Sequence, residues 1–313
     1  MNVARTVRLM FTAGAVEATT HANLPAVRAD GAHRGETATV ERLTCDDPAR
    51  PTAHRDHVSF PLADVVDLPG EADDEVDVEG VCRNGPYLWV VGSRSAKRRE
   101  VKPSHSDAKA ATRLASVSAE PSRRVLARIA LADPVPAERT PEGASSAALG
   151  RGGLVELLAE GEHLRPFLDL TGKENGFDVE GIAVHGEAGQ ERVHLGLRGP
   201  VLRGWAVLLQ LKPRAGTDGE LVLASRGGHR CAKTFLDLDG LGIRACVCTE
   251  RTCRCSPGRR WTSTARVRAY RLAGRRSPGH CRRGPPRRPA QRARPVPRGR
   301  RRPRRRTGGA ALR

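Results

Sequence analysis

The chain has 313 residues with 54 Lys and Arg against 35 Asp and Glu, which gives a formal net charge of +19. Residues 251–313 contain 23 Arg and no Lys, Asp or Glu, so residues 1–250 hold the other 31 basic residues and all 35 acidic ones. A basic protein is therefore excluded for the first 250 residues. Three Trp, two Tyr and five Phe are too few for a stacking surface that binds single-stranded nucleic acid. No apolar run reaches the roughly 18 residues of a membrane-spanning helix.

Residues 1–245 read as short apolar stretches separated by turn residues, the pattern of β-strands. The first apolar stretch, near residues 7–11, is too short for an export signal, so we expect a strand there and a cytoplasmic protein without disulfides. Residues 153–164 are the one helical pattern, and residues 94–120 are predicted to form a surface excursion. Further strands are predicted at residues 40–43, 57–66, 87–91, 124–131, 181–185, 193–197, 205–211, 221–224 and 233–238.

An internal repeat lies within this region. Residues 77–81 (DVEGV) recur as residues 178–182 (DVEGI), 101 residues later, and a hairpin pattern follows each copy. A spacing of this size fits two blades of a β-propeller, whose blades take roughly 40–50 residues each. We therefore predict an all-β, propeller-like fold, in which radial repetition of small sheets protects the strand edges.

The repeated D-V-E-G motif carries paired carboxylates. Residues i and i+2 of a strand point to the same face, so Asp77 projects with Glu79, and Asp178 with Glu180. Oxygen-only clusters of this kind suit Ca²⁺ or another divalent cation. Alternatively, each carboxylate accepts backbone N–H groups at a blade corner. The glycine that follows permits a tight turn or close backbone approach.

Four longer stretches carry a family resemblance: DVEG at residues 77–80, LWVVGSRSAKRR at 88–99, GKENGFDVEG at 172–181 and LGLRGPVLRGWA at 195–206. Together they resemble the bacterial family of domains of unknown function numbered 3616, over residues 5–245. The resemblance implies a propeller-like fold and no assigned activity. A more distant likeness to the esterase-like phytase propellers implies phosphate chemistry at a bound metal.

Residues 246–313 differ in composition from the rest of the chain. They are rich in Arg and Pro and poor in apolar residues, so we predict a disordered basic tail. One interpretation is out-of-frame translation of a G+C-rich gene, because the family continues with strands and an acidic motif that this chain lacks; the propeller would then be incomplete. The other is a genuine basic arm that binds nucleic acid without sequence specificity. The C-x-C-x4-C-x-C spacing from Cys246 to Cys255 differs from the C-x2-4-C pairs of structural zinc sites, whose intervening residues form a tight turn that points both sulfurs at one metal. A zinc site is therefore not expected there.

Two functions remain open from the sequence. The first is a metal-dependent phosphoesterase, in which the four carboxylates hold the cation. The second is a non-catalytic propeller that binds a small molecule or a protein, since fold alone does not choose a function. Whether the chain is an enzyme is left open, because no nucleophile or base has a diagnostic spacing. Ser93, Ser95 and Lys97 could form a nucleophile cluster, although a polar loop at a strand end is the better explanation. The predicted ligand-binding residues are Lys173, Glu174, Asn175, Arg198 and Arg203, of which the last two could instead pair with the blade acids.

Overall fold

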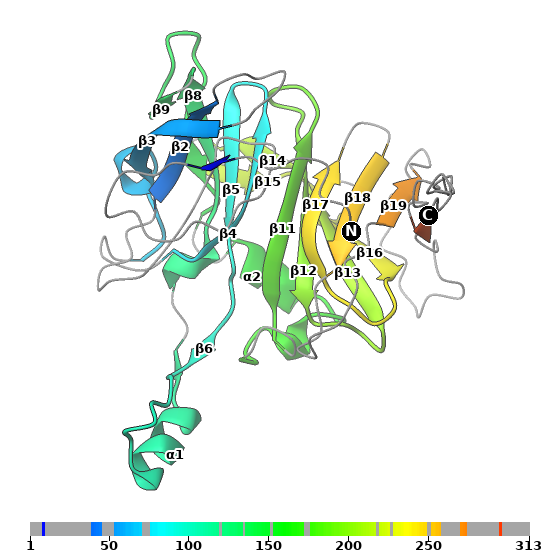
Figure 1. Ribbon diagram of the computed structural model, residues 1–313. Helices are drawn as coiled ribbons and strands as arrows, with labels where there is room; N and C mark the ends of the chain where they lie inside the picture. The colour runs from blue at the N-terminus through cyan, green and yellow to red at the C-terminus, as the bar shows by residue number, and fades with distance from the viewer. Residues whose placement is uncertain are drawn as a thin grey trace, which may run out of the picture.

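The computed structural model shows a stack of small antiparallel sheets (Figure 1). The residues that it describes are 8–9, 39–45, 53–70, 76–118, 121–133, 135–150, 153–171, 176–216, 219–225, 228–248, 252–257, 270–273 and 294–295.

Three sheets follow one another along the chain, and we call them the first, second and third blade. In each, the strand that comes first in sequence lies at one edge and faces the neighbouring blades; it is termed the inner strand. The first blade contains β4 (Val78–Asn84), β5 (Tyr87–Gly92), β8 (Leu126–Ala132), β9 (Val135–Ala137) and β10 (Ala147–Ala148). The second contains β11 (Asp178–His185), β12 (Arg192–Gly199), β13 (Trp205–Leu211) and β16 (Cys231–Asp237). The third contains β17 (Ile243–Cys248), β18 (Thr252–Pro257), β19 (Tyr270–Ala273) and β20 (Arg294–Pro295).

The remaining elements border these blades. A fourth sheet, the N-terminal sheet, packs against the first blade, and two further two-stranded ribbons are present. The N-terminal sheet contains β1 (Arg8–Leu9), β2 (Thr39–Cys45) and β3 (Ala53–Pro61), and the ribbons pair β6 (Lys97–Arg98) with β7 (Val117–Ser118) and β14 (Pro213–Ala215) with β15 (Leu221–Leu223). The helices are α1 (Asp107–Ala115) and α2 (Gly153–Ala159), with short 3₁₀ turns η1 (Leu62–Asp64), η2 (Pro121–Arg124) and η3 (Arg165–Phe167).

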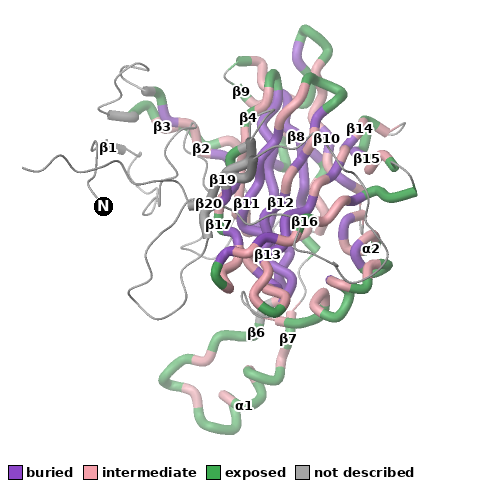
Figure 2. Tube along the Cα trace, turned by 90° about the vertical axis from the view of Figure 1, so that its right-hand side faces the viewer, coloured by how far each residue is buried: buried purple, intermediate pink, exposed green. Residues whose placement is uncertain are grey.

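An apolar layer fills each space between neighbouring sheets. Along β5, Leu88 and Val90 face the N-terminal sheet, whereas Trp89 and Val91 face the second blade. Strands buried on both faces need continuous apolar sequence rather than alternation, which explains why residues 87–91 read YLWVV. The buried residues form a central band that runs through the stack (Figure 2).

The all-β, propeller-like fold is therefore confirmed. The inner strand β11 packs between β4 and β17, as neighbouring blades do. Among the residues that the structure describes, the sheets do not close into a ring, so the arrangement is an incomplete propeller. The repeat prediction is also confirmed, because both D-V-E-G copies stand at the start of an inner strand.

The predicted excursion at residues 94–120 forms an arm that projects from the blades (Figure 1). Its helix, α1, begins at the N-cap Ser106, whose side chain accepts a hydrogen bond from the backbone of Lys109, and buries none of its residues. The predicted boundary between residues 245 and 246 falls inside β17, with β18, β19 and β20 beyond it. Most of residues 258–313 lie outside the described residues, so the predictions of disorder and out-of-frame translation stay predictions.

Candidate functional site

The three inner strands share one irregularity at the same place. Each pairs with the next strand of its blade through a register shift, and the residue that the shift leaves over is Glu79 in β4, Glu180 in β11 and Arg244 in β17. Such β-bulges re-aim a side chain and occur often beside functional sites. Two acids and one arginine thus occupy equivalent positions in consecutive blades.

The glycine of the motif permits this close stacking. A Cβ on Gly80 would lie 2.9 Å from Cγ2 of Ile182, and a Cβ on Gly181 would lie 3.1 Å from Sγ of Cys246. Each glycine therefore lets the following inner strand approach closely. The sequence allowed this glycine to serve either a tight turn or a close backbone approach. The structure shows the close approach.

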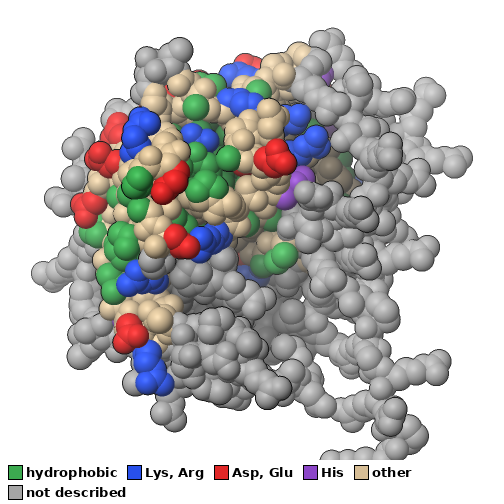
Figure 3. All heavy atoms as spheres, turned by 90° about the horizontal axis from the view of Figure 1, so that it is seen from above, with side chains coloured by type: hydrophobic (Ala, Val, Ile, Leu, Met, Phe, Trp, Pro, Cys, Tyr) green, Lys and Arg blue, Asp and Glu red, His purple; other side chains and the backbone are tan. Residues whose placement is uncertain are grey.

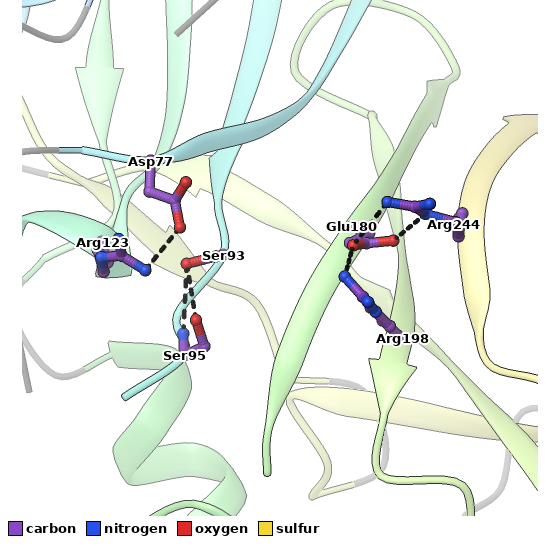
Figure 4. Close-up of polar contacts among 7 residues, drawn as sticks. All are labelled: Asp77, Ser93, Ser95, Arg123, Glu180, Arg198 and Arg244. Atoms are coloured by element: carbon purple, nitrogen blue, oxygen red, sulfur yellow. Dashed lines mark hydrogen bonds and ion pairs between the residues drawn. The ribbon is translucent and has the colours of Figure 1, made fainter. Parts of the chain in front are cut away.

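Glu180 is the centre of a charged cluster that joins two blades (Figure 4). Its side chain is 2% exposed, and its Oε1 accepts a hydrogen bond of 2.5 Å from Nη1 of Arg198 in the same blade. Arg244 reaches across from the third blade, with Nε 2.7 Å from Oε2 and Nη2 3.4 Å from Oε1. This two-point contact is the geometry in which a guanidinium binds a carboxylate most strongly.

Glu180, Arg198 and Arg244 together carry one net positive charge, because two guanidiniums meet one carboxylate. The Arg244 side chain is 50% exposed, and two of its nitrogens are used by Glu180. Arginine carries five N–H donors, so donors remain for a further acceptor. The arrangement can therefore bind an anionic group at the bulges.

A second polar group lies beside the first at the start of the inner strands. Asp77 pairs with Arg123 of η2 through Oδ2 and Nη1, 2.7 Å apart. The backbone N–H of Ser93 donates to the carbonyl of Asp77, and the carbonyl of Ser93 accepts from Val179. The end of β5 therefore connects the start of β4 to the start of β11.

Of the predicted site residues, the structure brings Arg198 and Glu180 into contact. Asp178 is fully buried at the start of β11, and Arg203 is exposed in the turn before β13. Arg198 pairs with Glu180, which was the alternative that the sequence left open. Lys173, Glu174 and Asn175 lie outside the described residues.

A shared cation would need several acidic side chains close together. Within the described ranges, no three His, Cys, Asp or Glu side chains are close enough to hold a metal ion. The predicted Ca²⁺ or other divalent cation at Asp77, Glu79, Asp178 and Glu180 stays a prediction.

Cys246 and Cys255 face each other across β17 and β18 with their sulfurs 3.7 Å apart. This contact together with burial raises the pKa of Cys246 well above its usual value.

Sequence reasoning missed Arg244, Arg123 and Arg94. Residues 242–245 (GIRA) occupy the same place at the start of β17 as residues 178–181 (DVEG) in β11. Both segments have an apolar residue, a charged residue and a small residue in that order before an apolar stretch, and this pattern was the available signal for Arg244. Arg123 and Arg94 have no such signal, because only tertiary contacts bury them.

These features define a class: an incomplete propeller-like protein with a charged cluster where its inner strands bulge. The chain belongs to the family described as protein of unknown function DUF3616, whose model matches residues 31–291. The match extends beyond residue 245, where the resemblance in the sequence was expected to end. No curated protein matches the chain, and the likeness to phytase propellers is not confirmed. No described helix has the length and hydropathy required to cross a membrane.

Proposed function

We propose that this protein is a binding propeller that recognises a small anionic molecule at the bulged inner strands. The observation that carries the proposal is the convergence of Arg198 and Arg244, from two blades, on the single buried carboxylate of Glu180. Glu180 orients both guanidiniums but neutralises only one of them. The remaining positive charge and the free donors of Arg244 suit an anionic group that binds from solvent.

The setting supports specific binding over general attraction to anions. Viewed from above, at the end of the blades away from the arm, the described surface mixes Lys and Arg with Asp and Glu (Figure 3). Recognition of an anion would therefore depend on the arginines that Glu180 orients. Because Arg244 lies on a different blade from Glu180, a ligand held there would also stabilise the contact between the blades.

Thermal unfolding of the full chain tests the proposal, with malonate and citrate as anionic probes and glycerol as the uncharged control. We expect at least one anion to raise the Tm of the wild type in a saturable manner and to leave the Arg244→Gln variant unchanged. Arg230→Gln is the matched control, because Arg230 forms only a long, exposed pair with Glu160 at 3.8 Å. An equal response of wild type and Arg244→Gln to every anion would refute the proposal.

A purely structural ion pair is the competing explanation, and the same measurement separates it. If the cluster only joins the blades, Arg244→Gln lowers the Tm by a similar amount with and without anions. If it binds a ligand, the difference in Tm between wild type and variant grows with anion concentration, as expected when a ligand binds the native state alone.

A further inference from the structure

Arg94 carries a buried guanidinium in which two of the three nitrogens have no acceptor. The residue is 7% exposed, and its Nε and Nη2 are buried without a hydrogen-bond partner. Burial and the nearby charge of Arg124 lower the pKa of Arg94 to about 9, so the side chain is still a cation at neutral pH. A buried cation without a counter-charge is strongly unfavourable, which points to an anion that completes the site.

The backbone holds Arg94 firmly in place. Its N–H donates to the carbonyl of Arg123 at 2.9 Å, and its φ of 61° is a left-handed conformation that side chains other than glycine rarely adopt. The preceding Ser93 is bonded on both sides, to Asp77 and to Val179. Strained and fixed backbone of this kind concentrates at sites that bind ligands.

A hydroxyl donor lies next to this guanidinium in the chain. Oγ of Ser93 accepts hydrogen bonds from Oγ of Ser95 at 3.2 Å and from the backbone N–H of Ser95 at 3.4 Å. The proton of the Ser93 hydroxyl is therefore available for another acceptor. Both serines are buried, so this polar loop lies inside the protein and not on its surface.

The charges around Arg94 favour an anion. Arg123 is neutralised by Asp77, whereas Arg124 lies close enough for its charge to lower the pKa of Arg94. Arg94 and Arg124 thus carry two positive charges, and the buried carboxylate of Asp178, which precedes Val179, offsets at most one of them. A phosphate group carries about −1.5 to −2 charges near neutral pH, and its oxygens match the planar fork of arginine.

We infer that Arg94, Ser93 and Arg124 bind a phosphate group at the end of β5. The source is either free inorganic phosphate or a phosphate monoester, and both present the same oxygens to these donors. The inference does not rest on the proposed function, because it uses none of the residues of the Glu180 cluster. It gives the Ser93–Ser95 loop a binding role without a nucleophilic one.

Calorimetric titration and thermal unfolding of the full chain test this site, with inorganic phosphate as the probe and chloride at equal ionic strength as the reference. We expect phosphate to bind the wild type and raise its Tm. The Arg94→Met variant should bind phosphate at least 10-fold more weakly, yet unfold in phosphate-free buffer at the same temperature as the wild type or higher, because it removes an uncompensated buried charge. Arg165→Met, at an exposed arginine of η3, is the matched control and should behave as the wild type.

Two results would overturn the inference: equal phosphate affinity of wild type and Arg94→Met, or a Tm loss in Arg94→Met that is the same with and without phosphate. If Arg94→Met fails to fold, the Ser93→Ala variant takes its place. The inference requires Ser93→Ala to bind phosphate several-fold more weakly than the wild type, and an unchanged affinity contradicts the inference. Titration with glycerol 3-phosphate identifies the source: tighter binding than phosphate indicates an ester, and absence of binding indicates the free ion. Arg244→Gln should retain the phosphate response.

Discussion

The carboxylate of Glu180 determines which charge the inner strands present. Had this residue stood alone, a buried acid would invite a cation or take up a proton. Two guanidiniums reach it instead, one through a two-point contact from the next blade. A motif that reads as acidic in sequence is therefore part of a positively charged cluster in the fold.

A second effect at the scale of single residues concerns His194 on β12. Its ring stacks on His185 with the centroids 5.1 Å apart. Burial, followed by the charges of His185 and Arg192, lowers the pKa of His194 to about 4. The residue is thus neutral in the folded state over a pH range in which the unfolded chain binds a proton.

We expect this difference to weaken the fold in mild acid. Between pH 6.5 and about 4 the unfolded state takes up a proton that folded His194 does not, so stability is lost as the pH falls through this window. The His194→Gln variant should lose less free energy of unfolding than the wild type over this window. The difference between the two losses should reach at most about 3 kcal/mol at the acid end of the window. Urea unfolding at several pH values measures this difference, with the exposed His229→Gln as control. Parallel curves for wild type and His194→Gln would contradict the expectation.

At the scale of elements, glycines determine how closely the blades approach one another. A Cβ on Gly196 of β12 would collide with Ile243 of β17 and lie 2.8 Å from Sγ of Cys246. Both neighbours belong to the buried layer between the second and third blades. The contact therefore has no room to adjust without moving a strand.

Gly196→Ala should destabilise the fold by about 1–3 kcal/mol, the usual cost of overpacking a core. Chemical denaturation of the full chain measures the loss. Gly150→Ala is a suitable control, because the nearest atom to its added Cβ is the end of the flexible Glu220 side chain. Equal stability of the two variants would show that the second and third blades are not packed as described.

The sequence predicted many of the strands better than the site between them. Apolar stretches bounded by turn residues located β5, β11 and β12, because these patterns arise from burial of whole strands, whereas the inner strands β4 and β17 were not among the predicted strands. The D-V-E-G repeat located two equivalent bulges. Arg244 escaped prediction because its partner Glu180 lies 64 residues away in the sequence. Arg94 escaped prediction because its burial depends on tertiary contacts that a local pattern does not encode.

At the scale of the whole molecule, the arm and the blades are separate in their packing. The arm projects away from the sheets (Figure 1), and its helix α1 buries no residue. Because burial of apolar surface supplies most of the folding free energy, the arm contributes little to the stability of the blades.

Replacing residues 99–116 with a short Gly-Ser linker should therefore change the Tm by no more than a few degrees. The residues that join the arm to the first blade, Ser93 to Arg98, stay in place in this variant. Differential scanning calorimetry is the measurement. A large drop in Tm, or loss of a cooperative transition, would show that the arm packs on the body of the protein in solution.

The most direct test of the account is calorimetric titration of one anion, malonate, into the wild type, Arg244→Gln and Glu180→Gln. An anion site at the bulges requires that Arg244→Gln abolish binding. It also requires that Glu180→Gln strengthen binding, because the glutamine removes the competing negative charge and can still accept a hydrogen bond from an arginine. A parallel titration with Ca²⁺ tests the opposite case. The anion site is contradicted if the wild type binds Ca²⁺, if Glu180→Gln abolishes that binding, and if malonate produces no heat. These three results together would show that the inner strands hold a cation.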